Sequence, residues 1–172
     1  MLGVKYKKSG FTLIEIIISL AIVMITFTAV TSIYNAVNKN VVLEKRRQHT
    51  SMYNNTIVQS IQNKGIEYVR NIKDKNLIYI YFDNNNELLS IIDDLENKGK
   101  KLEFNINEDK EIFEKLKSNK NEKNYGACIK IKENRKSENN FFESYTLNII
   151  VWDLNLDFTQ SGQSMSTFEI GR

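Results

Sequence analysis

The sequence predicts an α+β fold in which a long N-terminal helix precedes a strand-rich globular part. Three observations lead to this prediction. The chain of 172 residues has no proline, and no glycine lies between Gly10 and Gly65, so nothing breaks a helix there. Residues 11–30 are almost entirely apolar. Beyond residue 66, short runs of β-branched and aromatic residues alternate with Asn-rich connections, which is the pattern of strands and turns.

Residues 11–30, FTLIEIIISLAIVMITFTAV, carry a single charge. As a helix they extend about 30 Å, which matches the hydrocarbon thickness of a bilayer. Three basic residues stand just before this segment: Lys5, Lys7 and Lys8. The positive-inside rule therefore predicts one membrane pass, with the N-terminus in the cytoplasm and the rest of the chain outside.

Two ordinary explanations of this segment are a secretory signal peptide and a plain signal anchor. The apolar run is longer than that of a secretory signal, and Ala29-Val30-Thr31 is a poor site for signal peptidase. Neither explanation accounts for Glu15, because an ionisable side chain within an apolar helix is unfavourable unless it has a partner. Glu15 is therefore a candidate functional residue.

Lys8-Ser9-Gly10 followed by Phe11-Thr12-Leu13-Ile14-Glu15 resembles the class III signal of type IV prepilins and pilin-like proteins. The resemblance covers about the first thirty residues. It implies that a membrane-embedded prepilin peptidase cleaves between Gly10 and Phe11 and N-methylates Phe11. Residues 1–10 would then be a leader peptide, with a mature chain that begins at Phe11.

The resemblance also implies a role for Glu15 in assembly. Glu15 lies four residues from the new amine of Phe11, on the same helix face. In the family this carboxylate pairs with the terminal amine, and the partner amine is expected to belong to the neighbouring subunit. Opposite charges about 4 Å apart attract by several kcal/mol where screening is poor. The expected partners are therefore other pilin subunits, the peptidase, the assembly platform and, before assembly, the membrane.

The predicted helix continues past the membrane segment to residue 64, so that 11–64 form one helix and 65–172 a globular head. Apolar residues recur at helical spacing in an amphipathic second half, first Ile33, Val37 and Val41, then Met52, Ile57, Val58 and Ile61. A polar run at 44–51 interrupts the stripe. Lys64-Gly65 is a plausible C-terminal stop.

The head is expected to contain several strands. Residues 77–82 and 88–92 are interpreted as a hairpin around an Asn-rich turn, with a short helix over 87–97 as the alternative. Strands are also predicted at 102–106, 128–132 and 145–152, and a helix at 109–118. The family resemblance implies that the long helix packs on a small antiparallel sheet, and the strand pattern agrees with this.

The composition leaves little room for catalysis. One cysteine and one histidine exclude disulfides within the chain and histidine-rich metal sites, although Cys128 and His49 remain available as a nucleophile and base. We interpret Cys128 as a buried structural residue and His49 as a surface one. No enzyme activity, cofactor or metal is therefore expected.

Other candidate sites have ordinary interpretations. Asp83, Asn85, Glu87 and Asp94 have part of the spacing of a calcium loop, but Leu88 replaces its glycine, so a solvated turn is expected. Lys45-Arg46-Arg47 is interpreted as a solvated or intersubunit salt-bridging surface, with DNA or anionic lipid as the alternative. The aromatic group Phe141, Phe142, Tyr145 and Trp152 is expected in the core.

Nucleic acid is not an expected partner. The net charge of +3 is accounted for by the three leader lysines, and the remainder is neutral. The predicted function is a structural subunit of a type IV pilus, with a minor pilin favoured over a major one. A pseudopilin of a competence or secretion system, and a signal-anchored external binding module, remain alternatives.

Overall fold

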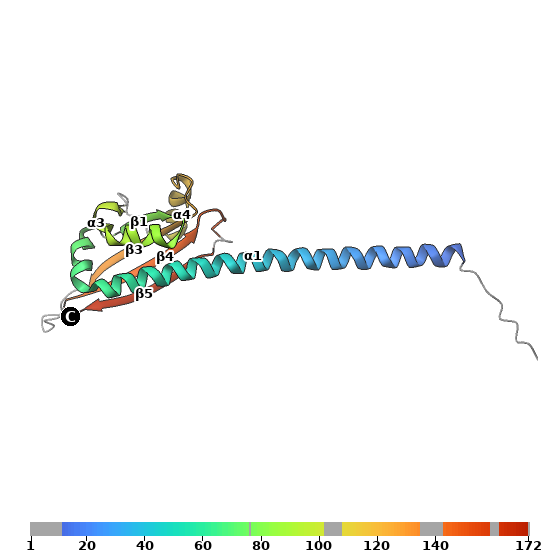
Figure 1. Cartoon of the computed structure of the whole chain (residues 1–172), viewed down its shortest axis with the longest axis horizontal. Coiled ribbons are helices and arrows are strands. Elements are labelled where there is room, and N and C mark those ends of the chain that lie inside the picture. The colour runs from blue at the N-terminus through green and yellow to red at the C-terminus, as the bar shows by residue number, and fades with distance from the viewer. Residues whose placement is uncertain (1–11, 76, 102–107, 135–142, 159–161, 172) are drawn as a thin grey trace, which may run out of the picture. The chain divides into compact units, whose positions relative to one another are not determined.

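The computed structural model describes residues 12–75, 77–101, 108–134, 143–158 and 162–171. Its described residues form two compact units, one ending at Val42 and the other spanning Leu43–Arg172. Helix α1, Leu13–Ile72, contributes to both units (Figure 1). The predicted strand at 102–106 lies outside the described residues, as do Phe141 and Phe142.

The second unit is built around an antiparallel sheet with the strand order β2-β1-β3-β4-β5. The strands are β1 Leu77–Phe82, β2 Lys100–Lys101, β3 Tyr125–Asn134, β4 Ser144–Asp153 and β5 Ser164–Gly171. All neighbouring strands are antiparallel. The predicted α+β class, with a long helix on a small antiparallel sheet, is confirmed.

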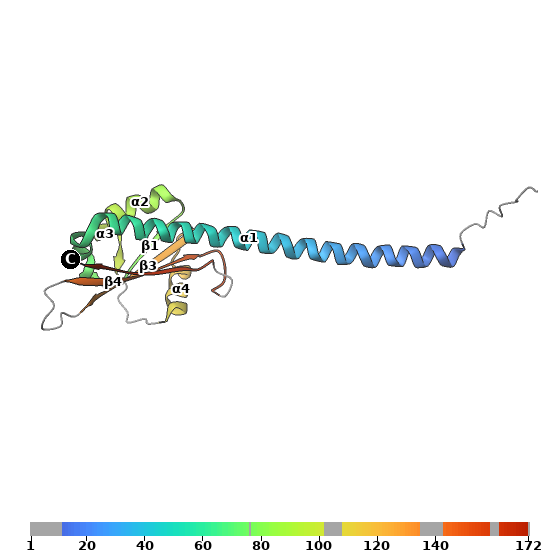
Figure 2. The same cartoon turned by 90° about the horizontal axis from the view of Figure 1, so that it is seen from below.

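Helices cover both faces of this sheet (Figure 2). The C-terminal half of α1 packs on one face together with α2, Asn85–Asp93, and α3, Leu95–Lys98. Helix α4, Asp109–Ser118, packs on the other face. Alternating residues of the strands serve the two cores, so Ile149 and Val151 face α1 whereas Ile150 and Trp152 face α4.

Helix α1 has a break near the predicted end of the helix. Gly65 has φ 77° and ψ −174°, a backbone conformation open to glycine and unfavourable for other residues. The prediction of a stop at Lys64-Gly65 therefore located the break correctly. It missed the further helical turns to Ile72, in which Val69 and Ile72 are buried against the sheet.

The predicted hairpin at 77–92 is wrong, and the alternative of a short helix is correct. Residues 77–82 form β1, but Leu88 and Ile92 belong to α2. Asn84 caps this helix by accepting a hydrogen bond from the Glu87 backbone N–H at 3.0 Å. The Asn-rich turn is thus a helix start, and the apolar residues after it follow helical spacing.

The second half of α1 contacts the sheet through polar as well as apolar residues. Tyr53, Ile57 and Ile61 are buried, whereas Met52, which was expected in the stripe, is 48% exposed. Asn54 is fully buried, and its amide donates to the carbonyl oxygens of Ile149 at 3.1 Å and Ser164 at 2.9 Å. The helix is therefore hydrogen-bonded directly to β4 and β5.

The polar run at 44–51 contacts the sheet through Arg46. Arg46 donates to the carboxylate of Asp153 at 2.9 Å, and Asp153 is only 2% exposed. The backbone of Gly162 lies against the same helical turn: a Cβ at Gly162 would stand 3.0 Å from the Arg47 nitrogen. This corrects the expectation for Lys45-Arg46-Arg47, because Arg46 forms its salt bridge within the chain.

A second ionic cluster joins the end of α1 to the start of β4. Arg70 donates to the two oxygens of Glu143 at 2.5 and 3.3 Å, and also to Glu67 at 2.6 Å. The buried Tyr145 hydroxyl donates to Glu143 as well. These hydrogen bonds from Arg70 and Tyr145 lower the pKa of Glu143 from 4.5 to about 2.

We predict that Asp153→Asn reduces the free energy of unfolding by about 1–3 kcal/mol, because it removes the charged partner of Arg46 at a buried position. Urea unfolding of the full chain in detergent, followed by the fluorescence of the single Trp152, measures the change. Asp157→Asn is the matched control, since Asp157 pairs with Lys117 at an exposed position. Equal stabilities of the two variants would contradict the anchoring role.

We also predict that Glu143 makes stability depend on pH. Because its pKa is lower in the folded chain than in the unfolded chain, its contribution is complete above pH 4.5 and disappears as the pH falls towards 2. Glu143→Gln should therefore have a flatter dependence than the wild type between these values. Urea midpoints measured from pH 5 to pH 2.5 test this, and parallel profiles would contradict it.

Candidate processing and assembly site

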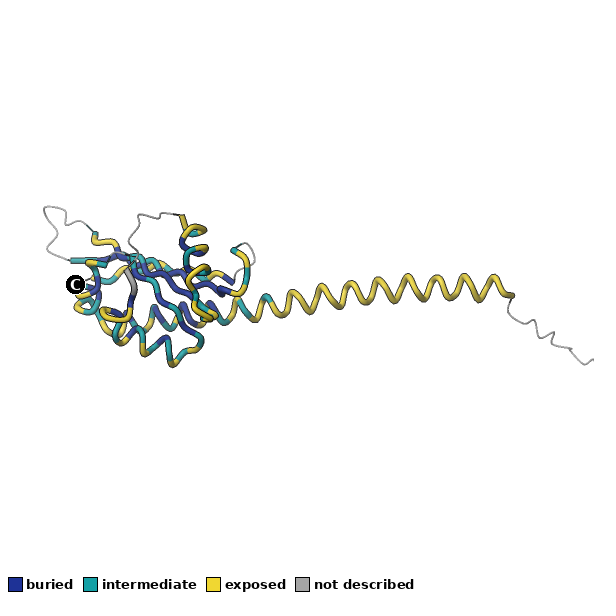
Figure 3. The backbone as a smooth tube through the Cα atoms, turned by 90° about the horizontal axis from the view of Figure 1, so that it is seen from above, coloured by how far each residue is buried: buried dark blue, intermediate teal, exposed yellow. Residues whose placement is uncertain are grey.

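The first unit is an apolar helix with an uncovered surface. All residues from Thr12 to Val42 are exposed (Figure 3). Among its large apolar side chains, exposure ranges from 52% at Val37 to 75% at Leu13. This part of α1 is long and apolar enough to cross a membrane. Such a surface is far larger than the apolar patches that soluble monomers leave in water.

Three threonine hydroxyls of this segment bond within the helix. The hydroxyls of Thr26, Thr28 and Thr31 donate to backbone carbonyl oxygens of the preceding turn, Thr26 to Val23 at 2.9 Å, and the other two at 2.8 Å. Hydroxyls paired in this way need no water. The helix can therefore lie in lipid or against other apolar helices without unpaired hydroxyls at these three positions.

Glu15 is the single charged residue of segment 11–30, and its carboxylate is bonded to the start of the helix. Its Oε2 atom accepts hydrogen bonds from the Thr12 backbone N–H at 2.8 Å and from the Thr12 hydroxyl at 2.9 Å. The Glu15 N–H in turn faces the Thr12 hydroxyl oxygen at 3.3 Å. This reciprocal arrangement is a capping box, which satisfies backbone donors that a helix start leaves without partners.

The capping box makes Thr12 a functional candidate that the sequence analysis missed. The signal was present in the sequence, because Thr12-Leu13-Ile14-Glu15 has the T-x-x-E spacing of this motif. Both hydrogen bonds reach Oε2. Within the described residues, the other carboxylate oxygen, Oε1, has no hydrogen-bond partner. The predicted leader lysines, Gly10 and Phe11 lie outside the described residues.

The calcium alternative is not supported by the geometry of its residues. Asp83 accepts hydrogen bonds from the Asn124 backbone and side chain, both at 2.8 Å, and pairs with Lys123 at 3.0 Å. Glu87 pairs with the same lysine at 2.6 Å. Within the described ranges, no group of three or more metal-ligating side chains occurs. These carboxylates hold the turn before β3 to the start of α2.

The remaining candidates are structural. Cys128 is buried beneath α4, and burial raises the pKa of its thiol to about 12, so the reactive thiolate is absent at neutral pH. His49 is half-buried rather than fully solvated, with its ring 6.5 Å from that of Tyr53. Trp152 and Tyr145 are buried, as expected. His49 lies on α1, which packs on one face of the sheet, whereas Cys128 lies beneath α4 on the other face. The two residues therefore do not form a nucleophile and base pair.

Comparison with known proteins agrees with the N-terminal pattern. The prokaryotic N-terminal methylation motif matches residues 5–31. This match marks a class III signal peptide, which is typical of type IV pilin-like proteins. No curated protein and no solved structure shows significant similarity to the chain. The chain thus carries the signal of a prepilin peptidase substrate.

Proposed function

We propose that this chain is a structural subunit of a type IV pilus, and more specifically a minor pilin. Prepilin peptidase would remove residues 1–10 and N-methylate Phe11. Residues 11–30 would hold the subunit in the cytoplasmic membrane, with the N-terminus inside and the head outside. The same helix would then pass from lipid into the core of the filament, leaving the head on its outside.

The observation that carries this proposal is the exposed apolar helix with one carboxylate at its start. Lipid or the helices of other subunits would cover the residues from Leu13 to Val42, whose apolar side chains are at least half exposed. A plain anchor would not need Glu15. A filament would, because the Oε1 atom, which has no hydrogen-bond partner among the described residues, can accept the charged amine of a neighbouring Phe11 while Oε2 remains bonded to Thr12.

The preference for a minor pilin rests on the head. Its lone cysteine is buried, and the loops of the described part are held by hydrogen bonds and ion pairs rather than by disulfides or metal. The methylation motif is equally compatible with a pseudopilin of a competence or secretion system. Subunit stoichiometry in purified filaments would distinguish minor from major, and the assembly machinery that incorporates the chain would distinguish pilus from pseudopilus.

The first prediction of this proposal concerns the N-terminus. Mass spectrometry of the protein purified from cells with a functional prepilin peptidase should find a chain that begins with N-methylated Phe11. Deletion of the peptidase should restore the leader. An intact Met1 in peptidase-positive cells, or a cut near residue 31, would overturn the proposal.

The second prediction separates the charge of Glu15 from its role in the capping box. Glu15→Gln keeps an oxygen that can accept from Thr12, because glutamine also serves in capping boxes, but it carries no charge. Glu15→Ala loses both. We expect both variants to be processed normally and to be incorporated into filaments at least tenfold less than wild type, since the amine lacks its ionic partner.

Quantitative immunoblotting of sheared filaments against the membrane fraction measures incorporation. Glu44→Gln is the matched control, because it removes one carboxylate from an exposed position on the same helix. If Glu15→Gln is incorporated normally and Glu15→Ala is not, the helix cap rather than the charge governs assembly, and the pairing mechanism is wrong.

A further inference from the structure

Strand β5, Ser164–Gly171, forms one edge of the sheet. Within the described ranges it pairs with β4 alone, from Ser164 opposite Val151 to Gly171 opposite Ser144. The outer side of β5 is named the β5 edge below. An edge strand of this length presents a row of backbone N–H and C=O groups that can pair with another extended segment.

The hydrogen bonds of Asn54 show which residues of β5 point to this edge. One amide nitrogen donates to the carbonyl oxygens of both Ile149 and Ser164, at 3.1 and 2.9 Å, so both oxygens lie in the space between β4 and β5. Ser164 therefore bonds to β4, and hydrogen-bonding residues alternate along an antiparallel strand. The backbone groups that point away from β4 are those of Met165, Thr167, Glu169 and Gly171.

The β5 edge lacks the features that keep natural sheet edges apart. Such edges are commonly protected by proline, lysine or a bulge. The chain has no proline, and none of its 24 lysine and arginine residues lies between Lys136 and Arg172. The register of β5 with β4 is unbroken, so it has no bulge. Glu169 is the single charged residue of the strand.

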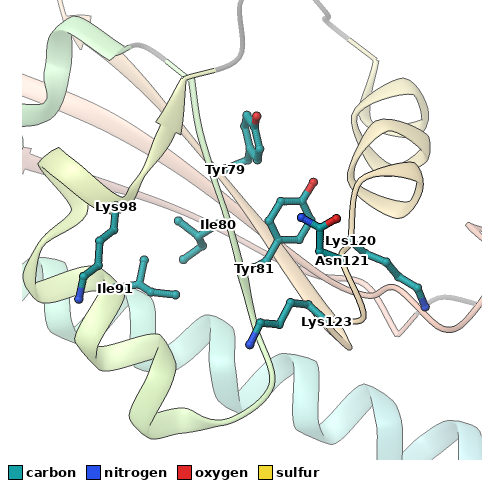
Figure 4. Close-up of a pocket in the computed structure, with 8 residues that line it drawn as sticks. All are labelled: Tyr79, Ile80, Tyr81, Ile91, Lys98, Lys120, Asn121 and Lys123. Atoms are coloured by element: carbon teal, nitrogen blue, oxygen red, sulfur yellow. The ribbon is translucent and has the colours of Figure 1, made fainter.

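The opposite edge of the sheet differs in this respect. There β2 pairs with β1, and a cavity of about 220 Å³ beside β1 is lined by three lysines, Lys98, Lys120 and Lys123 (Figure 4). Lysines at an edge disfavour pairing with another strand, because their charges would be buried or brought together. The contrast indicates that, of these two edges, the β5 edge is the one suited to association.

Helix α1 runs along β5 within the second unit. A Cβ at Gly162, just before β5, would stand 3.0 Å from the Arg47 nitrogen, and Asn54 bonds to Ser164. At the other end, Arg70 pairs with Glu143, next to the residue opposite Gly171. Three uncharged residues follow Arg47 at helical spacing, on the side of the helix towards β5: Ser51, Val58 and Gln62.

We propose that the β5 edge is a self-association surface, to which β5 of a second copy of this chain adds in antiparallel orientation. The two-fold axis passes at Phe168. Met165 then lies opposite Gly171 of the second copy, and Thr167 lies opposite Glu169 of the second copy. All four outward-pointing residues of each strand take part, which gives a continuous sheet across the two heads.

Side chains favour this register. Phe168 is only partly buried, although it lies on the face that α1 covers. At the two-fold axis its ring meets the Phe168 ring of the second copy, and aromatic cross-strand pairs are stabilising. Glu169 faces a threonine rather than another carboxylate. A two-fold axis at Glu169 would oppose two like charges and pair fewer residues.

The area of the contact favours a second copy over an isolated peptide. One added strand buries less than the about 800 Å² per partner that is usual in a stable interface. A second copy also brings its own α1 alongside the first, because each helix follows its own β5. Ser51, Val58 and Gln62 would then lie between the two helices without opposing charges. The pair thus buries a second layer that a peptide lacks.

This inference uses only the second unit and is independent of the proposed pilus function. A two-fold axis perpendicular to the strands reverses the direction of α1 between the copies. Subunits of one filament share one direction, so a pilin that paired in this way would join heads of different filaments.

Disulfide formation between two cysteine variants of the full chain in detergent micelles tests the register. Thr167→Cys and Glu169→Cys place thiols at positions that oppose each other across the axis, at a Cα separation of about 5.5 Å, within the range of a disulfide. Identical positions lie diagonally, at about 7–8 Å. After oxidation of the mixture with oxidised glutathione, mass spectrometry should find the mixed dimer about fivefold in excess of either homodimer.

Glu114→Cys replaces Glu169→Cys in the matched control, because Glu114 is an exposed carboxylate on α4, away from the β5 edge. Its mixture with Thr167→Cys contains the same apolar helices in the same micelles and should give no excess of mixed dimer. Cys128 is buried and does not interfere.

A second comparison tests whether backbone pairing is required. Met165→Pro in both cysteine variants removes an N–H that points away from β4, so the pairing with β4 is kept while the edge is blocked. We expect about tenfold less mixed dimer than with Met165→Ala, which shortens the same side chain and keeps the N–H. Trp152 fluorescence reports whether both variants are folded.

Three outcomes would overturn the proposal. The first is a yield of mixed disulfide no higher than in the Glu114→Cys control, and the second is homodimers as abundant as the mixed dimer. The third is an equal yield for Met165→Pro and Met165→Ala. If no mixed dimer forms but Thr167→Cys is cross-linked in cells to a different protein, the β5 edge binds another partner and self-association is wrong.

Discussion

The structure depends on one constraint, which is that no described part of the chain covers the apolar surface of α1 from Leu13 to Val42. Exposure of so much apolar surface to water is strongly unfavourable, so the helix needs to be surrounded by lipid or by other apolar helices. The bonding of the Glu15 carboxylate differs between these two environments. In lipid its carboxylate is only partly satisfied by Thr12, whereas in an assembly a terminal amine can complete its bonding.

The second half of α1 has the opposite character, because the sheet anchors it through specific polar contacts. Arg46 meets the buried Asp153, Asn54 bonds to β4 and β5, and Gly162 allows close approach of the backbone to the helix. At the C-terminal end of α1, Arg70 forms an ion pair with Glu143, next to the start of β4. The second half of this helix is thus joined to the sheet by buried, directional bonds. Such bonds specify one register between helix and sheet.

Much of this arrangement could be predicted from the sequence, because the spacing of apolar residues indicates which face of a helix or strand is buried. The long helix, the strands at 128–132 and 145–152, and the helix at 109–118 follow from apolar spacing. The segment after Asn84 was assigned wrongly, since a capping asparagine and a turn asparagine look alike without the rest of the fold. Strand β5 was missed because only alternate residues of it are partly buried, and Ser164 and Ser166 are two of these.

Some residues of the candidate site could be predicted from the sequence, whereas contacts between distant parts of the chain could not. Glu15 could be recognised because a charge within an apolar helix is conspicuous, and Thr12 was available from the same spacing rule. The partner of Arg46 could not be predicted, because 107 residues separate it from Asp153 and only the folded sheet brings them together.

The most direct test of the account is the distance between the Phe11 amine and the Glu15 carboxylate of different subunits. Filaments assembled from a mixture of ¹⁵N-labelled and ¹³C-labelled chains give a solid-state NMR contact between these atoms only if they belong to different molecules. The account predicts a contact at about 4 Å in filaments and none in membranes that hold unassembled subunits. Absence of the contact in these mixed-label filaments would contradict it.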